Sequence, residues 1–212
     1  MIFEDRTDAG KKLAERLAKY KEKNPALYAL PRGGVEVAVP IAQKLAVPMD
    51  LIIARKVGHP LQPEFGIAAI SEGGHLVTNP EMVATVDSEW FADEVARQQE
   101  IAKEKRQQYL SGLEVIQAEG RVAIIVDDGV ATGLTLMATI QNLLDKKPLK
   151  TVVAIPVAPK DTAEKLAQMV DELVVLEVPK EFAGAVGAYY ENFRQVSDEQ
   201  VIELLNKVNQ EI

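Results

Sequence analysis

The 212-residue sequence has no cysteine, only two histidines and few aromatic side chains. The lack of cysteine excludes disulfides, iron–sulfur clusters, cysteine–zinc sites and thiol nucleophiles, and two histidines exclude a multi-histidine metal centre. No apolar run approaches the roughly 18 residues of a membrane span, and the N-terminal segment has no apolar stretch typical of a secretory signal. The length suits one domain over residues 1–212, and 47% apolar residues suffice for a core without disulfides or a structural metal. Without a membrane span or secretory signal, we expect the domain to be soluble and cytoplasmic.

Basic residues are outnumbered as well, with 24 Lys and Arg against 32 Asp and Glu and a net charge of −8. This balance argues against a nucleic-acid partner, which usually meets a basic surface, and we expect no membrane partner. The charge is unevenly spread, since residues 1–60 hold 11 basic and 7 acidic side chains while the remainder holds 13 and 25. Several of the early lysines lie in one helical segment and are expected to form its solvated face.

Short, continuous apolar runs alternate with segments of helical periodicity along the chain. The runs predict strands at Ala26–Leu30, Asp50–Ala54, Val122–Val126, Thr151–Ile155 and Leu173–Leu176. The periodic segments predict helices at Thr7–Glu22, Val35–Leu45, Gly133–Asp145, from Asp161, and from Ser197 to about Asn209. This alternation is typical of an α/β protein with a doubly wound parallel sheet flanked by helices.

Two segments do not fit the alternation and are predicted to be insertions. Residues 65–71 and 75–78 form a hairpin pattern around Gly73-Gly74, and Ser88–Gln108 forms a long polar helix with Ser88 as its N-cap. Capping boxes are expected at Asp161 with Glu164 and at Ser197 with Gln200.

The strand Val122–Val126 is followed by unusual chemistry. Asp127 and Asp128 come directly after it, and a loop of small residues then leads into a helix; the loop residues are Gly129, Val130, Ala131, Thr132, Gly133, Leu134 and Thr135. Free N–H groups and the dipole at a helix N-terminus favour a phosphate, whereas two carboxylates would repel one and suit neighbouring hydroxyl groups. The sequence therefore predicts a sugar phosphate at the carboxyl end of the sheet.

The stretch Val122–Thr135 resembles the phosphoribosyl-pyrophosphate (PRPP) motif of type I phosphoribosyltransferases. The resemblance implies that Asp127 and Asp128 bind the ribose hydroxyls and take part in catalysis. It also implies that the loop binds the 5′-phosphate, through Gly129, Ala131, Thr132, Gly133, Leu134 and Thr135. A Mg²⁺ ion is implied as the cofactor, held indirectly by the two aspartates.

Two further strand ends carry positive charge. Arg32, Gly33 and Gly34 follow the first strand and resemble the pyrophosphate loop of the same family. Arg55 and Lys56 follow the second strand, where two cations could neutralise a diphosphate. We assign all five residues to pyrophosphate binding and count Lys56 among the catalytic candidates. Solvated strand ends are the alternative for Arg55 and Lys56.

Residues 55–67 and 185–201 resemble a group of bacterial phosphoribosyltransferases without a settled substrate, and that resemblance covers about residues 1–205. It implies transfer of a phosphoribosyl group from PRPP to a nitrogen acceptor, with a nucleobase expected, and release of pyrophosphate. Ala131 stands where 6-oxopurine enzymes have an aspartate that accepts a proton, which disfavours that mechanism. The alternative function is a non-catalytic PRPP-binding regulator. A homodimer is compatible with either.

Several side chains are left with two interpretations. Glu64 is either an acid–base group or an exposed loop residue, and His59 is either a titrating group or a surface residue. Tyr189, Tyr190 and Phe193 could stack on a base or pack in the core. Trp90 and Phe91 are expected to pack against the domain or a second subunit.

Overall fold

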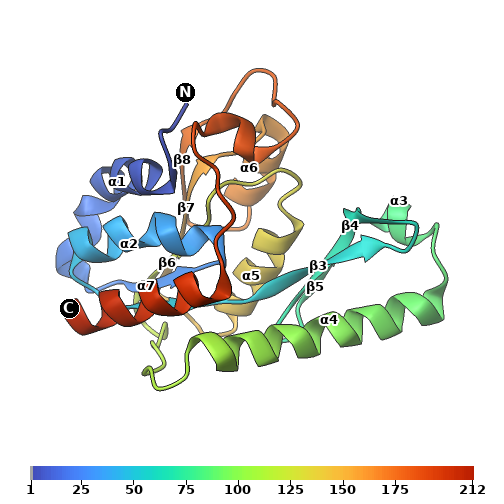
Figure 1. The fold of residues 1–212 in the computed structure, drawn as a ribbon, viewed down its shortest axis with the longest axis horizontal. Coiled ribbons are helices and arrows are strands. Elements are labelled where there is room, and N and C mark those ends of the chain that lie inside the picture. Colours follow the sequence, from blue (N-terminus) through green and yellow to red (C-terminus); the bar gives the residue numbers. More distant parts are fainter. Residues whose placement is uncertain (1) are drawn as a thin grey trace.

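The computed structural model describes residues 2–212, and its centre is a parallel sheet of five strands in the order β2-β1-β6-β7-β8 (Figure 1). The strands are β1 (Ala26–Ala29), β2 (Met49–Leu51), β6 (Val122–Val126), β7 (Lys150–Val157) and β8 (Glu172–Glu177). All residues of β1, β2 and β6 are buried, as expected for strands covered on both faces. The predicted doubly wound α/β sheet is confirmed.

Helices cover both faces of the sheet. One face packs against α1 (Arg6–Leu17), α2 (Gly33–Leu45) and α7 (Asp198–Glu211), and the other against α5 (Leu134–Leu144) and α6 (Lys160–Ala167). Two 3₁₀ segments complete the core, η1 (Ala18–Lys23) after α1 and η2 (Val186–Tyr189) after β8. No helix among residues 2–212 is long and apolar enough to cross a membrane.

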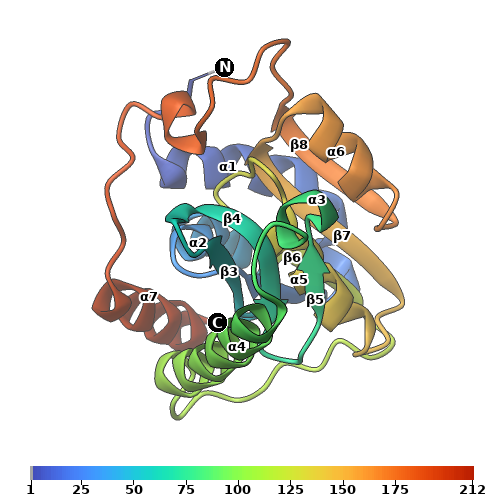
Figure 2. The same cartoon turned by 90° about the vertical axis from the view of Figure 1, so that its right-hand side faces the viewer.

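An arm projects from one end of the sheet and holds a second, antiparallel sheet in the order β3-β4-β5 (Figure 1). Its elements are β3 (Ala54–His59), β4 (Gln62–Ser71), β5 (Leu76–Thr78), α3 (Pro80–Val83) and α4 (Ser88–Tyr109). In Figure 2, which looks at the arm end-on, α4 lies beneath the three strands. Trp90 and Phe91 pack on the buried side chains of β3 and β4, which confirms packing within the chain.

The structure corrects several predicted boundaries. The second strand ends at Leu51, and Arg55 and Lys56 therefore do not follow its end. Residues 54–59 form the separate strand β3. Val57 is the one fully buried residue in this run of polar and small residues, so the apolar pattern did not indicate a strand. The cap of α4 is Asp87, which accepts from the Trp90 amide, and α6 begins at Lys160 without a side-chain cap. The hairpin at Gly73-Gly74 and the capping box of Ser197 with Gln200 are confirmed.

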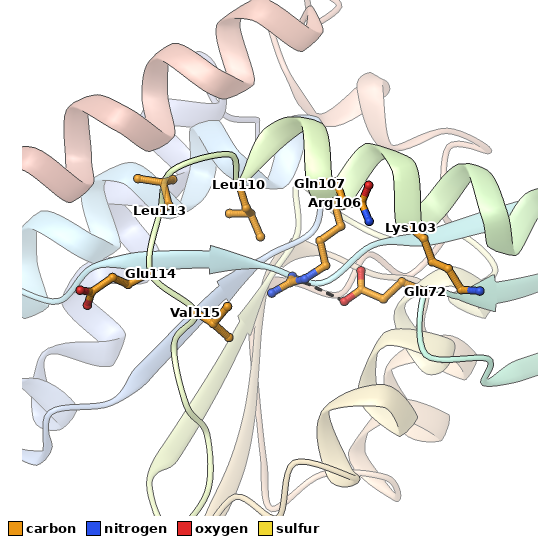
Figure 3. A pocket seen from close by; sticks show the side chains of 8 residues that line it. All are labelled: Glu72, Lys103, Arg106, Gln107, Leu110, Leu113, Glu114 and Val115. Atoms are coloured by element: carbon orange, nitrogen blue, oxygen red, sulfur yellow. Dashed lines mark ion pairs between the residues drawn. The ribbon is translucent and has the colours of Figure 1, made fainter.

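Arg106 of α4 is one of the residues that anchor the arm to the core. Arg106 of α4 contacts Asp50 of β2 at 3.0 Å and Glu72 of the β4–β5 turn at 3.5 Å. Figure 3 shows Arg106 and Glu72 pointing toward each other at the wall of a cavity of about 340 Å³. Burial raises the pKa of Glu72, and its carboxylate also accepts the Ile53 amide at 2.7 Å. This anchor fixes where β3 leaves the sheet.

Candidate functional site

The site lies at the carboxyl ends of β1 and β6, which are neighbours in the sheet. The loop after β1 carries Arg32, Gly33 and Gly34, and the loop after β6 carries Asp127 and Asp128. Because parallel strands end on the same edge, the two loops meet although they are almost 100 residues apart in the sequence. Both lead directly into helices, α2 and α5.

Glycine allows the two loops to touch. A methyl group at Gly33 would lie 1.9 Å from Asp128 Oδ2, and one at Gly34 would lie 2.8 Å from the carbonyl oxygen of Val126. Any side chain at either position would separate the loops. The peptide bond between Pro31 and Arg32 is cis. The structure thus brings the predicted pyrophosphate loop into contact with the predicted ribose-binding acids.

The loop from Gly129 to Gly133 leads into α5 and is exposed at Ala131 and Thr132, whereas its other three residues are buried. Gly133 has a φ of 77° and is the N-cap of α5, so the first N–H groups of this helix have no partner within it. Thr162 Oγ1 donates to the Ala131 carbonyl at 2.7 Å and steadies the loop from α6. Ala131 and Thr132 are exposed at the wall of a cavity of about 720 Å³ that also reaches β4, β5 and α6. The geometry suits an anion.

The two acids share one cation. Asp127 Oδ1 accepts the Asp128 amide at 2.8 Å, and Arg6 Nε donates to Asp128 Oδ2 at 2.7 Å. Burial and the neighbouring Asp128 charge raise the pKa of Asp127 well above its usual value, and burial raises the pKa of Asp128 although Arg6 opposes it. The Asp128 side chain is nevertheless 17% exposed, so a ligand can reach the pair. The two carboxyl groups titrate together.

The sequence analysis did not include Arg6 in the site. Its guanidinium also donates to the Arg194 carbonyl at 2.7 Å, lies 3.4 Å from Glu36, and stacks 3.9 Å from the centre of the Phe193 ring. The one sequence signal is its place in the first turn of α1, where the helix dipole disfavours a cation. Arg6 joins the acid pair to the C-terminal segment.

The aromatic residues near the C-terminus are used mainly for packing. Tyr189 and Tyr190 are buried, and Tyr190 contacts Phe3 and Phe193 with ring centres 5.4 and 4.9 Å apart. The Tyr190 hydroxyl donates to the Asp128 carbonyl at 2.6 Å. Of the two interpretations, core packing describes both tyrosines, and Tyr190 additionally supports the acid pair.

Cations from three elements line a pocket of about 280 Å³ beside Pro31. Arg32 precedes α2, Arg55 lies on β3, and Lys105 lies on α4; Tyr109 and Asp198 complete the wall. Arg55 Nε donates to Gln98 Oε1 at 2.6 Å. The structure therefore brings two of the predicted pyrophosphate residues together, and Lys105 was not foreseen because it lies in the inserted helix.

Lys56 lies apart from this pocket. Successive residues of a strand point to opposite faces, and Lys56 Nζ donates to the Glu64 carbonyl at 2.8 Å and contacts the Glu64 carboxylate at 3.2 Å. Glu64 itself is fully exposed. His59 Nδ1 accepts the Leu61 amide in the turn between β3 and β4. The catalytic assignment of Lys56 stays a prediction.

Among residues 2–212 there is no group of three or more His, Cys, Asp or Glu side chains that could hold a metal ion. The acid pair still offers hard oxygen ligands of the kind that Mg²⁺ takes alongside substrate phosphates and water. The residues present therefore fit an ion that arrives with a phosphorylated ligand.

Residues 3–192 match the model of the phosphoribosyl transferase domain, and the chain belongs to this family. It is 40% identical over 212 residues to "Putative phosphoribosyl transferase Rv0571c" of Mycobacterium tuberculosis strain H37Rv and to its counterpart in strain CDC 1551. These alignments cover 99% of this chain and 48% of each relative, so the chain spans about half of their length. The crystal structure of the protein TT1426 from Thermus thermophilus is 40% identical, with a TM-score of 0.80 over 98% of this chain and 99% of that one.

Proposed function

We propose that the chain transfers the phosphoribosyl group of PRPP to a nitrogen acceptor and releases pyrophosphate. The observation that carries this proposal is the contact between the loop of Gly33 and Gly34 and the acid pair, beside the open N-terminus of α5. One ligand with a phosphate, two hydroxyls and a diphosphate matches these three adjoining features. Membership of the phosphoribosyl transferase domain family supports the same reaction.

Each part of the site then has a role. The loop from Gly129 to Thr135 holds the 5′-phosphate with backbone N–H groups, and Asp127 and Asp128 accept the ribose hydroxyls. Arg32, the Gly33 and Gly34 amides and Arg55 hold the diphosphate. A bound Mg²⁺ ion supplies additional neutralisation of the diphosphate charge.

The reaction is a displacement at C1 of the ribose. The bond between C1 and the diphosphate oxygen breaks, the diphosphate keeps its electron pair, and a bond forms between C1 and the acceptor nitrogen, which loses a proton. The protein lowers the barrier by fixing both reactants and by stabilising the charge that develops on the diphosphate. Ala131 offers no group to take the proton, so the acceptor must lose it to another base or to solvent. We expect the acceptor to be a nucleobase outside the 6-oxopurine class.

Calorimetric titration with PRPP and Mg²⁺ tests the binding half of the proposal. Asp127→Asn and Asp128→Asn should each weaken PRPP binding at least tenfold, because each removes a charged acceptor of ribose hydroxyl protons. Asp145→Asn is the control, since Asp145 contacts His75 at 2.9 Å away from both loops. Unchanged PRPP affinity in both site variants would contradict the assignment.

A non-catalytic PRPP-binding regulator is the second candidate, and the lack of a proton acceptor at Ala131 favours it. A screen for pyrophosphate release with PRPP and purines, pyrimidines or small amines separates the two functions. Release with any acceptor establishes the transferase. Tight PRPP binding without release for the whole panel establishes the regulator.

A further inference from the structure

We propose that the pocket of Arg32, Arg55 and Lys105 is a diphosphate subsite in which Asp198 of α7 acts as an internal counterion that the diphosphate displaces. This inference rests on the proposed function and deepens it in two ways. It assigns a diphosphate ligand role to Lys105 of the inserted helix, and it makes the start of the C-terminal helix responsive to the ligand.

The Asp198 carboxylate already occupies the position of an anion in this pocket. Its Oδ1 accepts the Tyr109 hydroxyl at 2.6 Å and lies 3.7 Å from Arg32 Nη1, and its Oδ2 pairs with Lys105 Nζ. Donors from α4 and from the loop before α2 therefore converge on one carboxylate. The same donors can converge on a phosphate group of similar charge and geometry.

The charges of the pocket are not balanced by Asp198 alone. Arg32, Arg55 and Lys105 line it against a single acid, so the pocket keeps an excess of positive charge. Burial lowers the pKa of the Arg55 guanidinium, and the charges of Arg97 and Arg32 add to the effect, whereas Tyr109 and Glu94 oppose it. A diphosphate has more charge and more acceptor oxygens than a carboxylate, so it satisfies these donors more completely.

Asp198 can also lose these contacts without loss of the helix cap. It is the first residue of α7, where the dipole favours an acid, but the helix is capped by the reciprocal hydrogen bonds of Ser197 and Gln200. The exposed Glu199 is a second acid in the same turn. The dipole explains why an acid stands at this position, but it does not explain why Lys105 and Tyr109 of another helix bind it.

The test is a calorimetric titration of the full chain with inorganic pyrophosphate in the presence of Mg²⁺. Lys105→Met should weaken pyrophosphate binding about tenfold, which is the loss of one charge-assisted hydrogen bond. Asp198→Asn should tighten it about fivefold, because the competing charge is removed. The matched controls are Lys103→Met on the same helix and Glu199→Gln in the same turn, and both should stay within about twofold of the wild type.

Hydrogen exchange gives a second measurement. If Asp198 had only a structural role, adding pyrophosphate would not change the amide exchange rates around it. Pyrophosphate should speed amide exchange in residues 198–203 of the wild type, because the carboxylate loses Lys105 and Tyr109 as partners. Asp198→Asn should show fast exchange before the ligand is added. Slower or unchanged exchange on binding would overturn the displacement.

The outcomes separate this inference from the proposed function. If the wild type binds PRPP and pyrophosphate while Lys105→Met and Asp198→Asn bind pyrophosphate with unchanged affinity, the subsite is wrong and the proposed function stands. If neither the wild type nor Asp198→Asn binds PRPP or pyrophosphate, the proposed function fails and the subsite fails with it. Weaker pyrophosphate binding by Asp198→Asn overturns the role of the internal counterion.

Discussion

The pKa values of carboxyl groups are shifted in opposite directions at the two ends of the parallel sheet. At the carboxyl end, Asp127 and Asp128 share the single guanidinium of Arg6, and their pKa values are raised. At the amino end, Glu172 at the start of β8 accepts hydrogen bonds from Lys19, Tyr20 and Lys150; the donor–acceptor distances are 2.6, 2.5 and 2.8 Å. Burial alone would raise the pKa of Glu172, but these three bonds outweigh it and lower the pKa to about 2.

The two sites differ in how many hydrogen-bond donors the protein supplies to each carboxylate. Glu172 accepts three of the roughly four hydrogen bonds that a carboxylate can take, and all three come from the protein, so this network is mainly structural. The acid pair has fewer donors than it can accept, which leaves acceptor sites open for the ribose hydroxyls of the proposed ligand. The same sheet thus holds a carboxylate pair whose pKa values are raised and a single carboxylate whose pKa is lowered.

Replacing Arg6 should produce the largest effect. Arg6→Met removes the only cation that contacts the acid pair within residues 2–212, and the Arg6 side chain is 8% exposed. We expect the free energy of unfolding to fall by about 3 kcal/mol, as when a buried ion pair loses one partner. Urea denaturation measures this effect. Lys150→Met at the amino end is the control and should cost about 1 kcal/mol or less, because Glu172 keeps Lys19 and Tyr20. If Arg6→Met and Lys150→Met lost the same free energy of unfolding, the two ends of the sheet would not differ in how strongly their carboxylates depend on one cation.

Local patterns were sufficient to predict where the strand Val122–Val126 ends but not what converges on that end. Val122–Thr135 is contiguous, so its acids and glycines could be recognised together. Arg6 is 122 residues from Asp128, and Lys105 is 93 residues from Asp198. Such pairs form only when α1, α4 and α7 pack, and no spacing rule links them. β3 was missed because its alternation contains a single fully buried apolar residue, Val57.

The second-largest effect concerns the backbone that forms the carboxyl end. Gly133 and Gly112 have φ values of 77° and 80°, so a side chain costs about 1 kcal/mol in backbone conformation at either position. At Gly133 a methyl group would also lie 2.8 Å from Thr162 Cγ2, whereas at Gly112 it meets no atom within 4 Å. Gly133→Ala should therefore lower the free energy of unfolding by about 2 kcal/mol and Gly112→Ala by about 1 kcal/mol.

Chemical denaturation of the two variants measures this difference, and PRPP titration should show weakened binding for Gly133→Ala alone. Equal stability losses would mean that Thr162 moves aside. The loop would then be less tightly held than the Thr162–Ala131 hydrogen bond implies.

Neutralising Asp127 should stabilise the fold, whereas the preceding substitutions should destabilise it. Asp127→Asn keeps an oxygen that can accept the Asp128 amide but removes a charge that burial and Asp128 disfavour, so we expect a gain of about 1 kcal/mol in stability together with weakened PRPP binding. Because the native pKa of Asp127 is raised, the ionised form is the one that costs stability. The gain should thus be largest at neutral pH and should shrink as the pH falls through that pKa toward 4. Thermal melts across pH 4 to 8 check this, and a destabilised variant at pH 7 would contradict it.

The smallest change in stability is expected at the amino end of the sheet. There the substitution should cost stability at neutral pH, where Asp127→Asn should gain it. Glu172→Gln loses the charge that Lys19 and Lys150 contact, but both lysines are partly exposed, so the loss at pH 7 should be below about 1 kcal/mol. Since the native pKa of Glu172 is lowered to about 2, its contribution is complete above the unfolded value near 4.5 and disappears as the pH falls toward 2. The difference in melting temperature between wild type and Glu172→Gln should accordingly close between pH 5 and pH 2. If both variants followed the same pH profile, the two ends of the sheet would not differ in how they hold charge.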